Sequence, residues 1–145
     1  MNNKIIIING PNLNLLGERE QSQYGSITFE NLKKMCLQKA KELNVNLEFN
    51  QTNIEGEIVT TIQKARNKFD GIIINAAAYT HTSVGIGDAI KAIDTKVIEV
   101  HISNTFSREE FRHNSYLSPV VDGIIIGFGL KSYELAIESF LPKDE

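Results

Sequence analysis

Cysteine is scarce in this 145-residue sequence. Cys36 is the only one, so no disulfide can form within the chain, and a reducing cytoplasm is the compartment we expect. Cys36 lies in an apolar stripe at helical spacing, where a small packed side chain is expected rather than a nucleophile. Long apolar runs are missing too. The isoleucine run at residues 5–8 is too short for a signal peptide or a membrane span.

Excess charge is also missing. The formal net charge is −3, which provides no field for nucleic acid or an anionic membrane, so neither is expected as a partner. Any anionic ligand must therefore be held by local donors. Hydrophobic residues make up 41% and charged residues 23%, with no linker, repeat or low-complexity segment. We expect one domain over residues 1–145 with a real core.

The usual nucleotide-binding loops are not found. There is no P-loop, and no Ser/Thr-rich phosphate loop follows the first predicted strand. The segment Gly127–Ser132 resembles a fragment of a dinucleotide fingerprint, but it follows the last strand and favours a tight turn. A phosphoacceptor receiver would need acidic residues at the strand ends, where Asn9 and Asn75 stand instead. A flavin carrier is therefore disfavoured.

Strands and helices alternate along the chain. Apolar runs predict strands near residues 4–8, 47–49, 72–74, 97–102 and 123–126, each of the longer ones buried on both faces. Helical spacing predicts helices near 28–43, 57–69, 84–93 and 131–140. This pattern predicts an α/β fold with a doubly wound, five-stranded parallel sheet and helices on both faces. The flavodoxin-like strand order 2-1-3-4-5 is the one we expect, with a site between the ends of the first, third and fourth strands.

The long loop after the first strand is the predicted active-site loop. Gly10 and Pro11 end the strand, and the segment up to Gly25 is too long for a simple turn. It contains Arg19 and Tyr24, and a nearby arginine favours ionisation of a phenol, so Tyr24 could act as a general base. Taken alone, Tyr24 could equally be a packing residue.

His101 is the second candidate for proton transfer. Residues two apart share a face of a strand, so Glu99 lies beside His101 and can orient it. The spacing alone fits an acid/base imidazole and a structural hydrogen-bonded pair equally well. No histidine pair has the spacing of a helical metal motif, and we expect no metal. Arg108 and Arg112, which follow in a polar stretch, could fork onto a carboxylate or remain solvated.

Several blocks of the sequence together carry a family resemblance. They are Asn9–Gly17 with Arg19, Tyr24 and Gly25; Asn75–Ser83; Glu99–Asn104; Arg108–His113; and Gly127–Gly129 with Tyr133. In this order and register, the chain resembles type II 3-dehydroquinate dehydratase along essentially its whole length. The resemblance implies a hydro-lyase that eliminates water from 3-dehydroquinate to give 3-dehydroshikimate, a step of the shikimate pathway.

The resemblance also implies roles for individual residues. Tyr24 would remove the proton beside the ketone with help from Arg19, Asn12 would hold a water at the enolate oxygen, and His101, oriented by Glu99, would protonate the departing hydroxyl. The positions that match substrate contacts are Asn75, His81 and Arg112 for hydroxyls, Ile102 and Ser103 for the carboxylate, and Arg108 in the lid region. No cofactor, metal or lysine Schiff base is implied.

A homo-oligomer is implied as well. The family is typically a dodecamer of four trimers, and Asp88 matches a residue that reaches the site from a neighbouring subunit. Many members carry a basic residue before this aspartate, where Gly87 stands here, close to Gly85. Two glycines weaken a helix start, so the trimer contacts are where this chain departs from the pattern. The rival hypothesis is a non-catalytic flavodoxin-like module that binds a small ligand or a partner.

Overall fold

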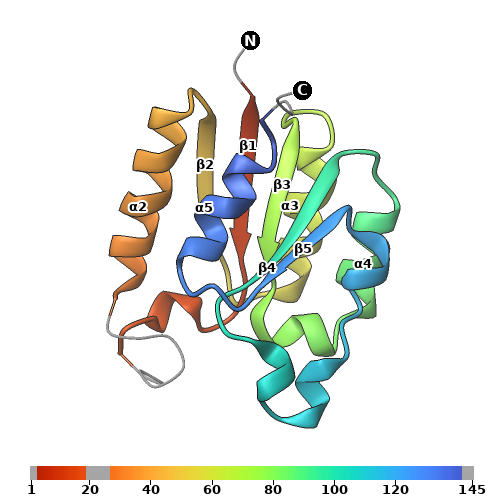
Figure 1. Ribbon diagram of the computed structural model, residues 1–145. Helices are drawn as coiled ribbons and strands as arrows, with labels where there is room; N and C mark the ends of the chain where they lie inside the picture. The colour runs from red at the N-terminus through yellow and green to blue at the C-terminus, as the bar shows by residue number, and fades with distance from the viewer. Residues whose placement is uncertain (1–2, 19–26, 142–145) are drawn as a thin grey trace.

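The computed structural model describes residues 3–18 and 27–141. Its centre is a five-stranded parallel sheet in the order β2-β1-β3-β4-β5 (Figure 1). The strands are β1 (Lys4–Asn9), β2 (Asn46–Gln51), β3 (Gly71–Asn75), β4 (Lys96–His101) and β5 (Gly123–Ile126). The predicted α/β fold and its flavodoxin-like strand order are confirmed.

Within the described residues, four α-helices cover the two faces of the sheet. They are α2 (Phe29–Glu42), α3 (Glu55–Ala65), α4 (Val84–Lys91) and α5 (Lys131–Glu138). Core residues of α2 and α5 pack in one hydrophobic cluster and those of α3 and α4 in the other, so each pair covers one face (Figure 1). Short 3-10 turns lie in the connections: η1 (Leu13–Leu15), η2 (Ala77–His81), η3 (Thr105–Ser107), η4 (Glu110–His113) and η5 (Ser118–Val120).

The isoleucine runs explain this layering. Successive side chains of a strand point to opposite faces, so an unbroken apolar run suits a strand covered on both sides. In β1, Ile5 and Ile7 pack toward α2 and α5, whereas Ile6 and Ile8 pack toward α3 and α4. Cys36 is fully buried in the first of these clusters, as its place in an apolar stripe predicts.

Helix ends follow the capping chemistry in the sequence. Thr28 caps α2 by accepting a hydrogen bond from the Asn31 backbone N–H, and Ser83 caps α4 through the Ile86 N–H.

The predicted end of α3 is wrong: the helix runs from Glu55 to Ala65 and not to Phe69. The backbone N–H groups of Lys68 and Phe69 both bond to the Ala65 carbonyl, which closes the chain into a turn.

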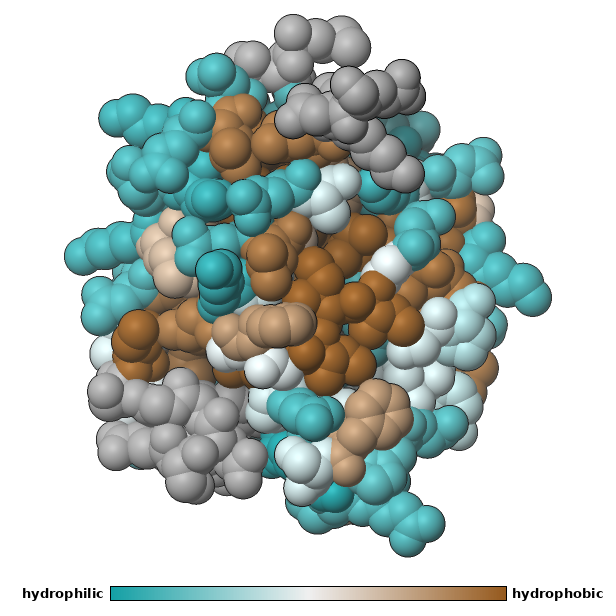
Figure 2. Space-filling model, viewed as in Figure 1, coloured by the Kyte–Doolittle hydropathy of each residue, from teal (hydrophilic) through white to brown (hydrophobic). Residues whose placement is uncertain are grey.

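The prediction that β5 is a buried strand is also wrong. β5 is the last strand of the sheet, with β4 on one side and, among residues 3–18 and 27–141, no strand on the other. Ile124 is 45% exposed, and the other residues of β5 are only partly buried. Figure 2 shows hydrophobic side chains gathered on the molecular face in the region of β4, β5 and α5. The apolar sequence of β5 is typical of a buried strand, but β5 lies at an open edge of the sheet.

Parallel strands bring their carboxyl ends to one edge of the sheet. Asn9 of β1 pairs with Asn75 of β3, and β4 ends beside them at His101. The predicted functional residues that the structure describes come mainly from this edge. None of the helices within residues 3–18 and 27–141 has the length and hydrophobicity needed to cross a membrane.

Candidate active site

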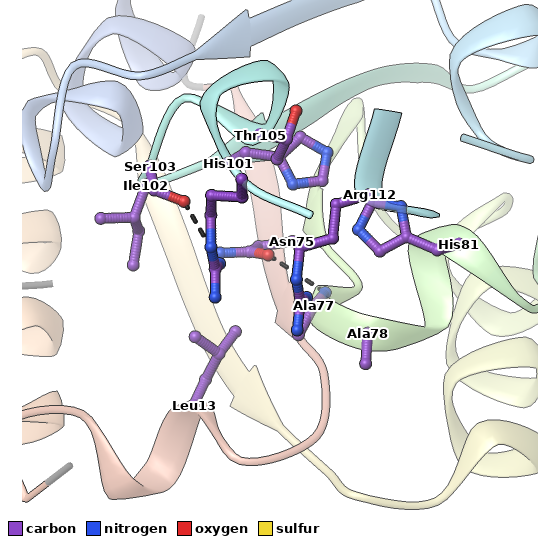
Figure 3. A pocket seen from close by; sticks show the side chains of 11 residues that line it. Leu13, Asn75, Ala77, Ala78, His81, His101, Ile102, Ser103, Thr105 and Arg112 are labelled. Carbon is purple, nitrogen blue, oxygen red and sulfur yellow. Dashed lines mark hydrogen bonds between the residues drawn. The ribbon is translucent and has the colours of Figure 1, made fainter. Parts of the chain in front are cut away.

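A pocket lies at the carboxyl edge of the sheet, with about 370 Å³ of open space. Its walls come from the segments that follow β1, β3 and β4, and Figure 3 shows Ile102 and Ser103 on one side, with Arg112 and His81 on the other. The lining residues are Leu13, Asn75, Ala77, Ala78, His81, His101, Ile102, Ser103, Thr105, Arg108 and Arg112. The structure therefore brings together seven of the predicted site residues: Asn75, His81, His101, Ile102, Ser103, Arg108 and Arg112.

His101 and Glu99 form a buried hydrogen-bonded pair. Both side chains lie on the same face of β4, and His101 Nε2 is 2.5 Å from Glu99 Oε2. Glu99 is 1% exposed and His101 6%. This geometry fixes the ring and leaves Nδ1 as the nitrogen that is not bonded to the carboxylate. An imidazole held in this way can donate or accept a proton at the pocket wall.

Glu99 is held in its ionised form. Burial alone would raise the pKa of a carboxyl group, because it disfavours the charge. Hydrogen bonds from His101, Ser118 and Ser115 outweigh burial and lower the pKa of Glu99 below its ordinary value. The Ser118 hydroxyl donates to Oε1 at 2.7 Å, and the Ser115 hydroxyl donates to Oε2 at 3.1 Å. A buried carboxylate thus faces the imidazole.

His81 is the second imidazole in the pocket. Its Nδ1 lies 2.8 Å from the Asn114 carbonyl oxygen, so Nδ1 carries the proton in this contact. Burial lowers the pKa of His81, which favours the neutral ring. The neutral ring keeps Nε2 as an acceptor for a hydroxyl or N–H group. Its centroid is 6.3 Å from that of His101, with the rings nearly parallel.

Two arginines supply positive charge to the pocket. Arg112 Nε donates to Glu109 Oε1 at 3.1 Å, and its guanidinium lies over the Phe111 ring at 4.9 Å. Arg108 Nη1 donates to the Ser103 hydroxyl at 3.4 Å. These contacts hold both guanidinium groups at the pocket wall, where paired N–H donors suit a carboxylate or adjacent hydroxyls.

Asn75 belongs to a buried polar chain at the base of the pocket. Its Nδ2 donates to the Tyr133 hydroxyl at 2.8 Å, and that hydroxyl donates to Asn9 Oδ1 at 2.7 Å. Asn75 Oδ1 accepts the Ala77 backbone N–H at 3.1 Å. The amide orientation is therefore fixed before any ligand arrives. The link that Tyr133 makes between the two asparagines follows from the topology alone.

Other predicted residues lie elsewhere. Asn12 is exposed at the start of η1 with φ of 69°, its backbone N–H bonded to Asn53 Oδ1, and it does not line the pocket described above. Asp88 is exposed on α4, also away from this pocket. Arg19 and Tyr24 lie outside the described residues.

Sequence reasoning missed some residues of this region. Leu13, Ala77, Ala78 and Thr105 line the pocket, and Ser115 and Ser118 reach Glu99 from a distant segment. The four lining residues adjoin predicted ones, so proximity in sequence was an available signal. The contact of the two serines with Glu99 had no such signal, because they stand 16 and 19 residues beyond it.

The side chains of this pocket are able to transfer protons and to bind a small polar molecule. It offers a carboxylate-bound imidazole, a neutral imidazole, a fixed amide and two guanidinium groups. In the part of the chain that the structure describes, no three His, Cys, Asp or Glu side chains are grouped to hold a metal ion. Fold and site together define a flavodoxin-like α/β protein with an acid/base pocket at the carboxyl edge of its sheet.

Comparison with known proteins gives the family. The family described as dehydroquinase class II matches residues 3–141. A 3-dehydroquinate dehydratase of Caldicellulosiruptor saccharolyticus is 55% identical over 92% of this chain and 93% of its own length. Catabolic 3-dehydroquinase 1 of Fusarium vanettenii is 49% identical over 95% and 96%. The crystal structure of type II dehydroquinase from Butyrivibrio crossotus superimposes with a TM-score of 0.94, at 48% identity over 95% and 97% of the two chains. The chain belongs to the dehydroquinase class II family.

Proposed function

We propose that this protein is a 3-dehydroquinate dehydratase of the shikimate pathway, acting in the cytoplasm toward aromatic amino acids. The observation that carries the proposal is the His101 imidazole, held by the buried Glu99, at the wall of a pocket lined by two arginines. A binding module would need the arginines but not a buried carboxylate held against an imidazole. Family membership and relatives named for this reaction support the same substrate.

The reaction is an anti elimination in two proton transfers. The Tyr24 phenolate takes the proton on the carbon next to the ketone, and the electrons of that C–H bond move to the ketone oxygen to form an enolate. His101 then gives a proton to the departing hydroxyl, and the enolate electrons re-form the ketone as the C–O bond breaks and water leaves. Glu99 orients the imidazole and balances its charge.

The remaining residues bind and orient the substrate. Arg19 lowers the pKa of the Tyr24 phenol, and Asn12 holds a water against the enolate oxygen; these roles rest on the family resemblance. Asn75, His81 and Arg112 bind hydroxyls, a role supported by their donors and acceptors around the pocket. The segment Ile102–Ser103 binds the carboxylate, and Arg108 beside the Ser103 hydroxyl closes over it. The chemistry requires neither a metal nor a cofactor.

The assembly is part of the proposal. The chain forms a dodecamer of four trimers, in which Asp88 of one subunit completes the pocket of its neighbour. Asp88 is exposed on α4 and is absent from the pocket of its own chain described above, as a residue with a role in a neighbouring subunit should be. Exposed large hydrophobic side chains, among them Phe106, Phe111 and Ile124, offer surface for subunit contacts.

The test is ultraviolet absorbance after mixing the protein with 3-dehydroquinate. The product is a conjugated enone, so the wild-type protein should give a rising absorbance band. Tyr24→Phe and His101→Asn should each slow the rise by about 10²-fold or more, since each removes a proton-transfer group. Tyr116→Phe is the matched control, because Tyr116 is 43% exposed and outside the pocket, and it should keep wild-type activity.

Each outcome has a defined meaning. Full activity in Tyr24→Phe would keep the dehydratase and reject the phenolate as its base. No absorbance rise from folded wild-type protein at any pH would reject the enzyme and favour a binding module.

A further inference from the structure

Glu99 is bound by more than its histidine. Three donors surround its two oxygens: His101 and Ser115 at Oε2, and Ser118 at Oε1. Two of these donors are hydroxyls from the loop that precedes β5. The imidazole of His101 would be enough to balance the charge of a buried carboxylate. The two serines therefore require a separate explanation.

The serine hydroxyls are themselves fixed by the backbone. Ser115 Oγ accepts the N–H groups of Leu117 and Ser118, both at 3.0 Å, so its proton is directed away from them toward Glu99. Ser118 begins η5 and precedes Pro119, whose ring restricts the backbone there. The local backbone thus holds the two serine hydroxyls in place independently of Glu99. Their positions determine where the Glu99 carboxylate lies.

The same segment is tied to the rest of the site. The Asn114 carbonyl accepts from His81 Nδ1, and the Tyr116 N–H donates to the Thr80 carbonyl at 2.9 Å. Residues 114–118, which we call the serine strap, thus connect both pocket imidazoles. Part of the strap borders a second cavity, about 560 Å³ of open space, that also reaches Glu99 and His101. In the described chain, the other titratable or charged side chains at that cavity are His81, Arg112 and His113.

We propose that Ser115 and Ser118 are positioning residues, whose hydroxyls fix Glu99 as the acceptor of the His101 hydrogen bond and so keep the shared proton on the imidazole. Glu99 and His101 share one hydrogen bond, and the imidazole keeps the proton of that bond as long as the carboxylate remains the acceptor. Each hydroxyl that donates to the carboxylate lowers its affinity for that proton. The inference rests on the proposed function, in which Nε2 of His101 keeps its proton toward Glu99 while Nδ1 gives a proton to the leaving hydroxyl.

Ser118→Ala is the decisive variant. It removes the donor to Oε1 but keeps the backbone N–H that bonds to Ser115, so the strap should remain folded. Ser115→Ala would also leave two backbone N–H groups without their acceptor, which makes it less informative. Ser118→Thr keeps a hydroxyl and should restore the wild-type behaviour. Ser139→Ala is the matched control, because the Ser139 hydroxyl, just beyond the end of α5, donates to the Ala136 carbonyl and not to Glu99.

Two measurements report the protonation of Glu99. The first is the pH profile of kcat: with one donor lost, the pKa of Glu99 rises, so the acid limb should move to higher pH by about one unit. At neutral pH, where Glu99 stays ionised, kcat should change little. On the acid limb, kcat at a given pH should fall by up to roughly 10-fold, while KM stays within about 2-fold because no pocket contact changes. The second is a 13C NMR titration of the Glu99 carboxyl without substrate, which should move in the same direction.

The results separate the possible explanations. An unchanged acid limb and an unchanged Glu99 titration in folded Ser118→Ala would overturn the proposal and leave the serines as turn caps. A fall in kcat that Ser118→Thr does not rescue would overturn it as well. If wild-type protein showed no dehydratase activity, the proposed function would fail. The carboxyl titration would still decide whether the serines act on Glu99.

Discussion

At the scale of single residues, buried polar groups decide how the pocket is shaped. Asn75 illustrates this, because its amide nitrogen bonds to the Tyr133 hydroxyl and its amide oxygen to the Ala77 backbone. Tyr133 is fully buried and also donates to Asn9. The phenol therefore links the ends of β1 and β3 from α5. Removing any one of these partners would destabilise the folded protein, because it would leave a buried polar group without a hydrogen bond that water cannot replace.

Tyr133→Phe tests this link. The change keeps the ring but leaves the Asn75 N–H and the Asn9 oxygen without their shared partner, so we expect the free energy of unfolding to fall by about 2 kcal/mol. Urea unfolding followed by circular dichroism measures it. The control is Tyr79→Phe, whose hydroxyl bonds to the exposed Asn53 carbonyl and should cost less than about 0.5 kcal/mol. Equal losses in both variants would contradict a special role for Tyr133.

At the scale of secondary-structure elements, α4 explains why two glycines stand in one short helix. A Cβ atom at Gly87 would lie 2.6 Å from the Tyr116 carbonyl oxygen, which is closer than real contacts allow. A Cβ at Gly85 would meet only the Ser83 hydroxyl, at 3.9 Å. Gly87 therefore lets the serine strap lie directly against α4. The departure noted in the sequence has a local packing reason.

The two glycines give a matched pair of variants. Gly85→Ala should stabilise the protein by up to about 1 kcal/mol, because alanine favours a helix and the space is open. Gly87→Ala gains the same helix preference but must push the Tyr116 backbone aside, so we expect a net loss of about 1–2 kcal/mol. Thermal unfolding of both variants measures the difference. A stabilising Gly87→Ala would show that the strap does not press on α4.

At the scale of the whole molecule, the subunit leaves several hydrophobic side chains exposed at and near the carboxyl edge. Phe106 and Phe111 are each 60% exposed, Phe128 is 64% exposed, and Ile124 marks the open edge of β5. These side chains come from segments that also line or adjoin the pocket. A homo-oligomer would bury such surface and could bring Asp88 of one subunit to the pocket of another.

Sedimentation equilibrium tests the assembly. Twelve copies of the 16.2 kDa chain give about 194 kDa, the mass we expect in solution. Asp88→Ala should keep this mass if the charge serves the neighbouring pocket, but lower kcat/KM for 3-dehydroquinate by about 10-fold or more. Asp94→Ala, another exposed acidic change just beyond α4, is the control and should leave both unchanged. A monomeric, fully active protein would refute the assembly and the role of Asp88 together.

The sequence by itself determined the elements, their order and much of the site. Unbroken isoleucine runs, helical stripes and capping residues act locally, so they could be interpreted without coordinates, and the pairing of Glu99 with His101 follows from the alternation of one strand. The family blocks then supplied seven pocket residues that the structure brings together.

Tertiary structure alone decided what depends on contacts between distant segments. The Tyr133 link to Asn9 and Asn75 spans 124 and 58 residues, and Ser118 reaches Glu99 across 19. The open edge at β5 has the same apolar pattern as a buried strand, so composition could not reveal it. Local periodicity fixes which face a side chain takes, but only the packed chain decides which group it meets there.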